Sequence, residues 1–230
     1  VQELAEREGE ARRGLIQDYA AVLDLQTSMF YRWRRRAMAA TSLKGLCDDS
    51  ARESAARLVA CHFPQVTLER YAGQFDCLVD EVRLDHRVDC SGLFGGDFNL
   101  LPQELGWLFI GKLERLEDRL GRKEFSDLAR LVFLQTCDDL WRSHINELQG
   151  LISNQVFGAA SHKSAVAHYI RQCFQAWGGF RERVVAEFLS RLLTLPLPRT
   201  DTQPPPTIQI NNDVRMLIAD LPTAVAAAGD

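Results

Sequence analysis

Hydrophobic and polar positions repeat with the period of an α-helix along most of the chain. From residue 123 to residue 195, mostly apolar side chains recur at spacings of four and three, which places them on one stripe of a helix. In the first half this stripe is Leu134, Asp138, Trp141, Ile145, Leu148 and Ile152. In the second half it is Tyr169, Cys173, Trp177, Phe180, Val184, Phe188 and Leu192. The pattern predicts two long antiparallel helices joined by a short turn within 158–164.

The same rhythm predicts one long helix over residues 1–44, with the stripe Leu15, Tyr19, Val22, Gln26, Met29, Trp33 and Ala37. Residues 45–122 differ, because three shorter helical segments, 50–61, 68–79 and 102–120, are separated by 62–64 and by the glycine-rich 90–97. Gly121 precedes the hairpin, 123–198, and Pro196 and Pro198 end its second arm. The remainder, 199–230, predicts a flexible tail. We expect an all-α fold, and the pattern alone favours the simpler interpretation that the hairpin is the central pair of an ordinary helical bundle.

Two blocks of residues resemble one known family. Asp138-x-x-Trp141-Arg142-x-His144, with Tyr169 and Phe174 on the return arm, resembles the two-helix finger of SecA, the ATP-driven motor of bacterial protein export. The block Tyr19-x-x-Val22-x-x-x-Gln26, followed by Phe30-Tyr31-x-x-Arg34-Arg35-Arg36, resembles the long scaffold helix of that family. The blocks occur in the family's order, and the resemblance covers residues 1–195. It implies a long scaffold helix, an inserted small helical wing domain at 45–122 and a two-helix finger.

The resemblance also implies partners and a contact site. The partners would be SecA-type motor domains, in the same or a separate chain, a SecY-type channel and preprotein substrates. The tip of the finger, which would contact the client or the channel, corresponds to Phe157, Ala160, His162 and Lys163. The family commonly carries an aromatic residue and an arginine at positions that are Ala160 and Gly158 here, and a methyl group offers a moving chain less contact. We therefore expect a divergent or accessory member.

Few residues suggest chemistry. The sequence lacks a Walker loop, so the resemblance implies that ATP and magnesium belong only to a motor region outside this chain, which by itself is expected not to be an enzyme. His144 and Asp138 are six residues apart and lie on different sides of a helix, so we expect a histidine hydrogen-bonded across helices rather than a catalytic pair. Cys61-His62 and His86-x-x-x-Cys90 suggest zinc, but neither has a second ligand pair. We expect no catalytic, cofactor or metal site.

Charge and composition limit the classes of partner and the cellular compartment. A net charge of -4 argues against a nucleic-acid partner. Six cysteines without a C-x-x-C pair suit a reduced cytosolic protein, and no apolar stretch is long enough to span a bilayer. We expect a cytoplasmic protein, either free or peripheral at the inner membrane. The arginine run 32–36 could attract acidic lipid, although a solvated face or interhelix ion pairs is the favoured interpretation.

Two functions follow from these observations. The first is the helical scaffold and wing region of a SecA-like preprotein translocase, which couples an ATPase motor to protein translocation through a membrane channel. The alternative is a stand-alone helical adaptor that binds proteins and has lost transport. The first residue is Val1 rather than Met, so we expect a fragment, a processed product or a trimmed form of a longer protein.

Overall fold

The computed structural model describes residues 2–64, 68–91, 93, 99–155 and 162–196. The tail predicted for 199–230 lies outside these residues. Within the described residues the chain forms six α-helices and no strand, which confirms the predicted all-α fold. The helices are α1 (Gln2–Ala39), α2 (Lys44–His62), α3 (Leu68–Asp85), α4 (Leu101–Leu120), α5 (Arg122–Gln155) and α6 (His162–Thr194).

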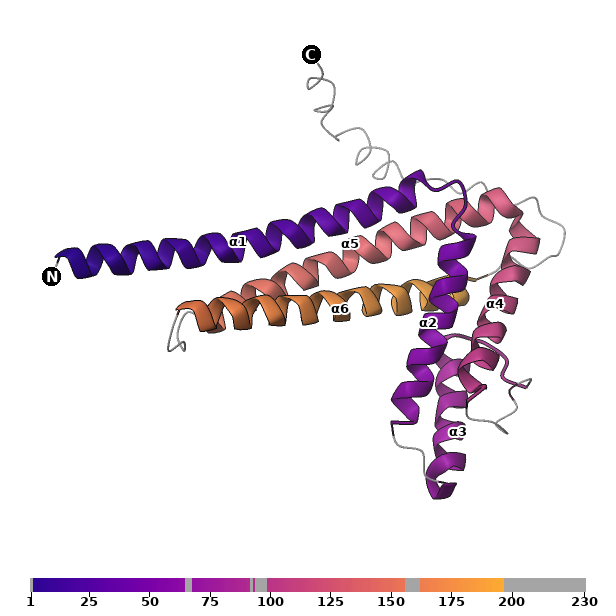
Figure 1. Ribbon diagram of the computed structural model, residues 1–230. Coiled ribbons are helices and arrows are strands. Elements are labelled where there is room, and N and C mark those ends of the chain that lie inside the picture. The colour runs from indigo at the N-terminus through magenta and orange to yellow at the C-terminus, as the bar shows by residue number, and fades with distance from the viewer. Residues whose placement is uncertain (1, 65–67, 92, 94–98, 156–161, 197–230) are drawn as a thin grey trace, which may run out of the picture. The chain divides into compact units, whose positions relative to one another are not determined.

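Three long helices carry the candidate site. Residues Val1–Leu195 form one compact unit. Within this unit, α5 and α6 run antiparallel as the predicted hairpin, and α1 lies along both of them (Figure 1). The remaining helices, α2 to α4, pack against one another near the start of α5. The predicted division into domains at residues 44 and 122 stays a prediction.

The inward stripe of α6 is confirmed by its burial. Every one of its predicted positions is at most 8% exposed: Tyr169, Cys173, Trp177, Phe180, Val184, Phe188 and Leu192. The stripe predicted for α5 is only partly right. Its buried side includes Phe125, Ala129, Phe133, Cys137, His144 and Leu148, whereas Asp138 is exposed. The reason is that α5 packs on α6 with one side and on α1 with another, so its contacts cover more than one stripe.

Backbone groups at the helix ends find specific partners. Arg130 on α5 donates from Nε to the carbonyl of Ala37 at 3.3 Å and from Nη2 to that of Ala40 at 2.7 Å, which satisfies carbonyls that α1 leaves free at its end. The N–H of Leu43, just before α2, donates to Oγ of the buried Ser126 at 3.1 Å. Both contacts tie the connection between α1 and α2 to the first turns of α5.

The pair formed by α2 and α4 is built from complementary sizes. The buried side of α2 is mostly small, with Cys47, Ala51 and Ala55 completely covered. The facing side of α4 supplies large side chains: Leu101, Leu105, Phe109 and Leu113. Small residues on one helix let the large ones on the other reach its backbone, which gives dense packing.

Ser190 on α6 donates to the carbonyl of Asp85 at 3.1 Å and connects the end of α3 to the long helices.

Candidate functional site

A buried polar chain joins the three long helices. Gln26 of α1 donates from Nε2 to the carbonyl oxygen of Cys173 on α6 at 2.8 Å. Its Oε1 lies 2.8 Å from Nε2 of His144 on α5. Gln26 and His144 are both completely buried. One glutamine side chain therefore connects α1 to both arms of the hairpin.

The geometry fixes the histidine tautomer. Because the amide nitrogen of Gln26 is used by a carbonyl, the amide oxygen faces His144 and can only accept. Nε2 of His144 must then carry the hydrogen, which leaves Nδ1 as the bare nitrogen, 4.0 Å from the carboxylate of Glu147. Burial lowers the pKa of His144, with Glu147 opposing this and Arg183 adding to it. The imidazole is hydrogen-bonded across helices in its neutral form, in agreement with the expectation from sequence.

Aromatic rings surround this polar chain. Phe30 of α1 stacks on Trp141 of α5, with ring centroids 4.2 Å apart and planes 7° apart. The ring of His144 stacks on Phe180 of α6 at 4.8 Å, and Trp177 lies edge-on to Trp141 at 6.5 Å. Such pairs contribute about 0.5–1.5 kcal/mol each beyond their buried area. The same three helices are thus also held by ring contacts on the side of Gln26 that faces away from the hairpin turn.

A second aromatic contact lies farther toward the hairpin turn. Tyr19 of α1 and Tyr169 of α6 are both buried, and their ring centroids are 4.2 Å apart. Burial raises the pKa of both phenols. They belong to a cluster with Val22, Leu148 and Cys173, so Tyr19 and Val22 of one sequence block pack together with Tyr169 of the other.

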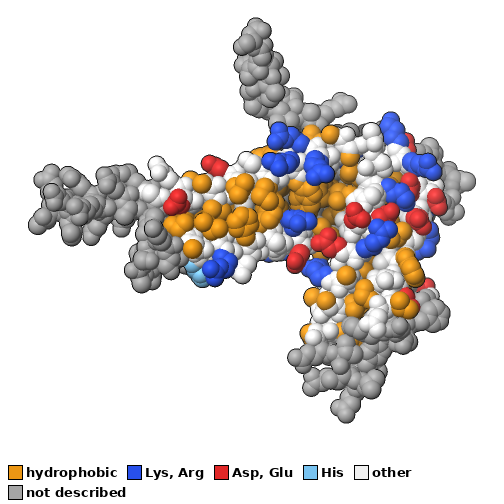
Figure 2. Space-filling view, in the orientation of Figure 1, with side chains coloured by type: hydrophobic (Ala, Val, Ile, Leu, Met, Phe, Trp, Pro, Cys, Tyr) orange, Lys and Arg blue, Asp and Glu red, His pale blue; other side chains and the backbone are white. Residues whose placement is uncertain are grey.

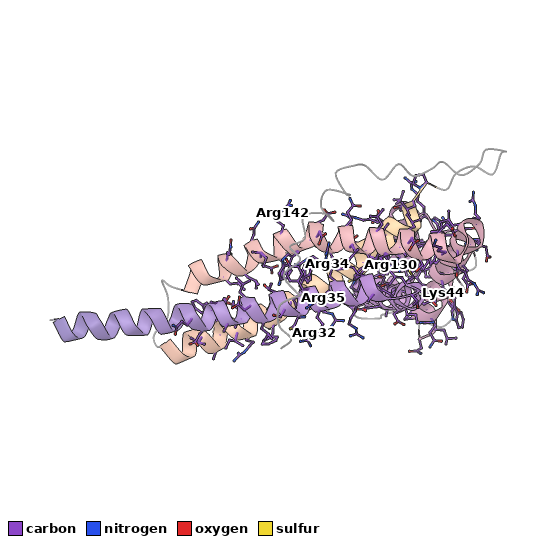
Figure 3. All side chains as sticks on the ribbon, turned by 90° about the horizontal axis from the view of Figure 1, so that it is seen from above. Arg32, Arg34, Arg35, Lys44, Arg130 and Arg142 are labelled. Atoms are coloured by element: carbon purple, nitrogen blue, oxygen red, sulfur yellow. The ribbon has the colours of Figure 1, made fainter. Side chains whose placement is uncertain are left out.

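An ion pair at the edge of the junction joins α1 to α5. Arg34 donates from Nε and Nη2 to the two carboxylate oxygens of Asp138, at 3.1 and 3.0 Å. The pair is bidentate but half exposed, so it contributes no more than about 1 kcal/mol. Figure 3 shows Arg34 between the two helices and Arg142 on the outer side of α5. The arginine run therefore supplies one interhelix ion pair, while Arg32 and Arg36 are exposed.

The structure separates the residues of the sequence motifs into two groups. One group meets at the junction of α1 with the hairpin: Tyr19, Val22, Gln26, Arg34, Asp138, Trp141, His144 and Tyr169. The other group is exposed: Tyr31, Arg35, Arg142 and Phe174. Of the predicted tip, Phe157 and Ala160 lie outside the described residues. His162 and Lys163 begin α6, and their side chains are also outside the described part.

Two contributors were not named as site residues from the sequence. Phe30, only 2% exposed, stands four residues after Gln26 and could have been assigned to the stripe of α1 by that spacing. Arg130 gave no signal, because its partners are backbone carbonyls of Ala37 and Ala40, which no side-chain pattern reveals. Both residues lie on the surfaces where α1 meets α5.

The sites considered for metal have other contacts. His62 places Nε2 2.7 Å from the carboxylate of Glu81, and Cys61 is exposed. His86 and Cys90 are buried. Within the described ranges, no three His, Cys, Asp or Glu side chains come together as a metal would need. None of the helices described has both the length and the apolar character needed to cross a bilayer.

The arrangement defines a class of protein. A long helix is held against a helical hairpin by a buried polar chain and stacked rings, and a small helical group packs beside them, so this is a helical scaffold. The chain belongs to the SecA Wing and Scaffold domain family, whose model matches residues 1–196. The family expected from the two sequence blocks is thereby confirmed.

Curated relatives agree with the family. A protein translocase subunit SecA from Polaromonas sp. is 24% identical over 205 residues, which cover 84% of this chain and 22% of that protein. The subunits from Streptomyces griseus and Desulforapulum autotrophicum are 25% and 22% identical, over 81% and 85% of this chain. The matches span only 20% and 24% of those two proteins. The chain thus spans less than a quarter of the length of these three relatives.

Proposed function

We propose that this chain is the helical scaffold and wing region of a SecA-like preprotein translocase. In this proposal it couples an ATPase motor to the movement of a preprotein through a membrane channel. The motor domains, in the same or a separate chain, and a SecY-type channel are its partners. ATP and magnesium are bound by the motor, and this chain contributes no catalytic residue. It works in the cytoplasm or peripherally at the inner membrane.

The observation that carries the proposal is the Gln26 junction. A displacement of α1 can be passed to the hairpin only if the helices do not slip past one another. Gln26 opposes slippage, because a shift along the helix axis would leave the buried N–H of His144 and the buried side-chain amide of Gln26 without partners. Each unsatisfied buried group costs about 1–3 kcal/mol. The junction supports transmission of motion from α1 to both arms.

Stacked rings reinforce this coupling. Phe30 and Trp141 are nearly parallel and in close contact, so rotation of α1 about its own axis would also break an apolar contact. Together the polar chain and the rings restrain both sliding and rotation. A junction with these restraints suits a helix that delivers force to a finger.

Site-specific crosslinking in cells tests the proposal. A photoreactive residue is placed at Ala160, in the predicted tip, in the longest native form of the protein, and the control carries it at exposed Arg122 at the start of α5. The proposal expects adducts of the Ala160 form with a channel subunit or a secreted precursor, and none of these with the Arg122 form. Adducts only with soluble proteins, or no adducts, would instead favour the stand-alone adaptor.

A further inference from the structure

One aromatic residue of the hairpin motif does not pack in the core. Phe174 lies one residue after Cys173, the residue that accepts from Gln26, yet its side chain is 48% exposed. At 100° per residue, Ile170 and Phe174 share the flank of α6 that is turned outward beside α1. Ile170 is half-buried against the cluster around Tyr169. An apolar edge of α6 therefore faces solvent.

The neighbouring flank of α1 is apolar as well. Leu25 is 48% exposed, and Met29, one turn later, is half-buried. Gln26 contacts the backbone of Cys173, so Leu25 lies at the level of Phe174 along the two helices. Figure 2 shows a continuous band of hydrophobic side chains along this face of the long helices. We call the strip formed by Leu25, Met29, Ile170 and Phe174 the α1–α6 groove.

One end of the groove is basic. Arg32 and Arg36 follow Met29 on α1, and Arg181 follows Phe174 by about two turns on α6. All three are exposed, and within the described part of the chain no carboxylate pairs with them. Figure 2 shows Lys and Arg side chains, together with Asp and Glu side chains, around the end of the apolar band nearer the shorter helices. Near the other end two acidic residues of α1 are exposed: Asp24, one position before Leu25 and therefore about 100° around the helix from it, and Asp18, about two turns earlier.

We propose that the α1–α6 groove binds an amphipathic helix of a partner protein whose apolar stripe ends in acidic residues. The carboxylates face Arg32, Arg36 and Arg181, and the apolar stripe covers Leu25 and Phe174. From Leu25 to Arg36 the groove is about 16 Å long, at about 1.5 Å per residue, so about three turns of helix fill it. Helix-in-groove recognition needs this combination of an apolar strip and a charged end. The site is separate from the predicted finger tip and does not depend on the proposed coupling.

Charge decides between this occupant and others. A basic or neutral amphipathic helix would leave three arginines unpaired or repelled at the edge of an apolar contact, which opposes binding. The apolar strip favours a protein partner over a simple polyanion, which would not cover Leu25 or Phe174. An acidic lipid surface shares the charge preference, and the experiment separates it.

The test uses two model peptides and the full chain of 230 residues. Both peptides are amidated helices of about three turns with leucines at i, i+3, i+4 and i+7. One has three glutamates at one end, and the other has lysines at the same positions. Binding is measured by fluorescence anisotropy. We expect the glutamate peptide to bind about 10-fold or more tightly than the lysine peptide, because three exposed charge pairs are exchanged for three repulsions.

Variants locate the binding on the groove. Phe174→Glu should weaken the glutamate peptide about 10-fold or more, and Leu25→Glu gives a second, independent test from α1. Trp107→Glu on α4 is the matched control, because Trp107 is 67% exposed and lies outside the groove. It should leave binding unchanged. Circular dichroism and thermal melting show whether each variant keeps its fold, and the exposure of both groove residues favours that outcome.

Three results would overturn the proposal. They are equal binding of the two peptides, binding that Phe174→Glu and Leu25→Glu leave intact, and binding only to vesicles of anionic phosphatidylglycerol. If binding to these vesicles were lost on charge reversal of Arg32, Arg36 and Arg181, the basic end would be assigned to a membrane surface. The crosslinking result at Ala160 is independent, so either proposal can fail alone.

Discussion

At the scale of single residues, His144 is the most constrained side chain of the junction. It is completely buried, donates from Nε2 to Gln26 and stacks on Phe180. No described carboxylate pairs closely with it, since the nearest oxygen of Glu147 is 4.0 Å away. A charge on this ring would therefore be poorly stabilised, which is why burial lowers the pKa of His144.

This pKa predicts how stability depends on pH. An unfolded histidine titrates near about pH 6.5, and the folded pKa of His144 is lower, so below about pH 6.5 the unfolded chain binds more protons. The stabilisation due to neutral His144 is complete above about pH 6.5 and is lost as the pH falls toward the folded pKa. The slope is at most about 1.4 kcal/mol per pH unit. Urea denaturation of the wild type and His144→Gln between pH 7.5 and 5 should show a shallower acid loss in the variant.

Comparing the wild type with His144→Gln isolates the contribution of His144 to the acid loss of stability. Burial also lowers the pKa of His86, which contributes an acid loss of the same sign to both proteins. The exposed His168 provides the matched control, and His168→Gln should keep the slope of the wild type. Identical slopes for the wild type and His144→Gln would contradict the assigned neutral state.

At the scale of elements, the connection between α4 and α5 depends on one glycine. Gly121 has φ 90° and ψ 153°, in a region that residues with a Cβ avoid. Its N–H closes α4 by donating to the carbonyl of Glu117 at 2.8 Å, and its carbonyl accepts from the N–H of Phe125 at 2.9 Å. Gly121 thus ends one helix and begins the next without a longer loop.

Alanine substitutions at two glycines should have opposite effects. Gly121→Ala forces a strained backbone and should lower the free energy of unfolding by about 1–3 kcal/mol. Gly150→Ala, inside α5 with open space around the added Cβ, should raise it by about 0.5–1 kcal/mol, since alanine favours the helix. Urea denaturation followed by circular dichroism measures both. A shift of both variants in the same direction would refute the conformational argument.

At the scale of the whole molecule, helices distant in sequence are joined by a few buried polar groups. Gln26 and His144 are 118 residues apart, and Gln26 and Cys173 are 147 apart. The group formed by α2 to α4 is attached in a similar way. One hydrogen bond runs from the N–H of Leu43 to Ser126, and another from the hydroxyl of Ser190 to the carbonyl of Asp85. These bonds give little gain over bonds to water, but their loss in a dry interface is costly.

Gln26→Leu should show this cost. The substitution keeps a side chain of similar volume but removes the partner of the buried His144 N–H, so the free energy of unfolding should fall by about 1–3 kcal/mol. Gln17→Leu, at an exposed position of the same helix, should change it by less than about 0.5 kcal/mol. Urea denaturation checks both values. If the two variants were equally stable, Gln26 could not be the residue that prevents slippage.

The sequence by itself determined the helical class, the hairpin, the family and the inward stripe of α6, and it indicated the imidazole bridge. These features rest on the helical period and on local motifs, which depend on neighbours three and four residues away. Only the tertiary structure decided that Asp138 turns to Arg34, that Arg130 holds the end of α1 and that Phe174 remains outside. The reason is that α5 meets α1 and α6 on different sides, and which flank each helix turns to which partner depends on packing between residues about a hundred positions apart in the chain.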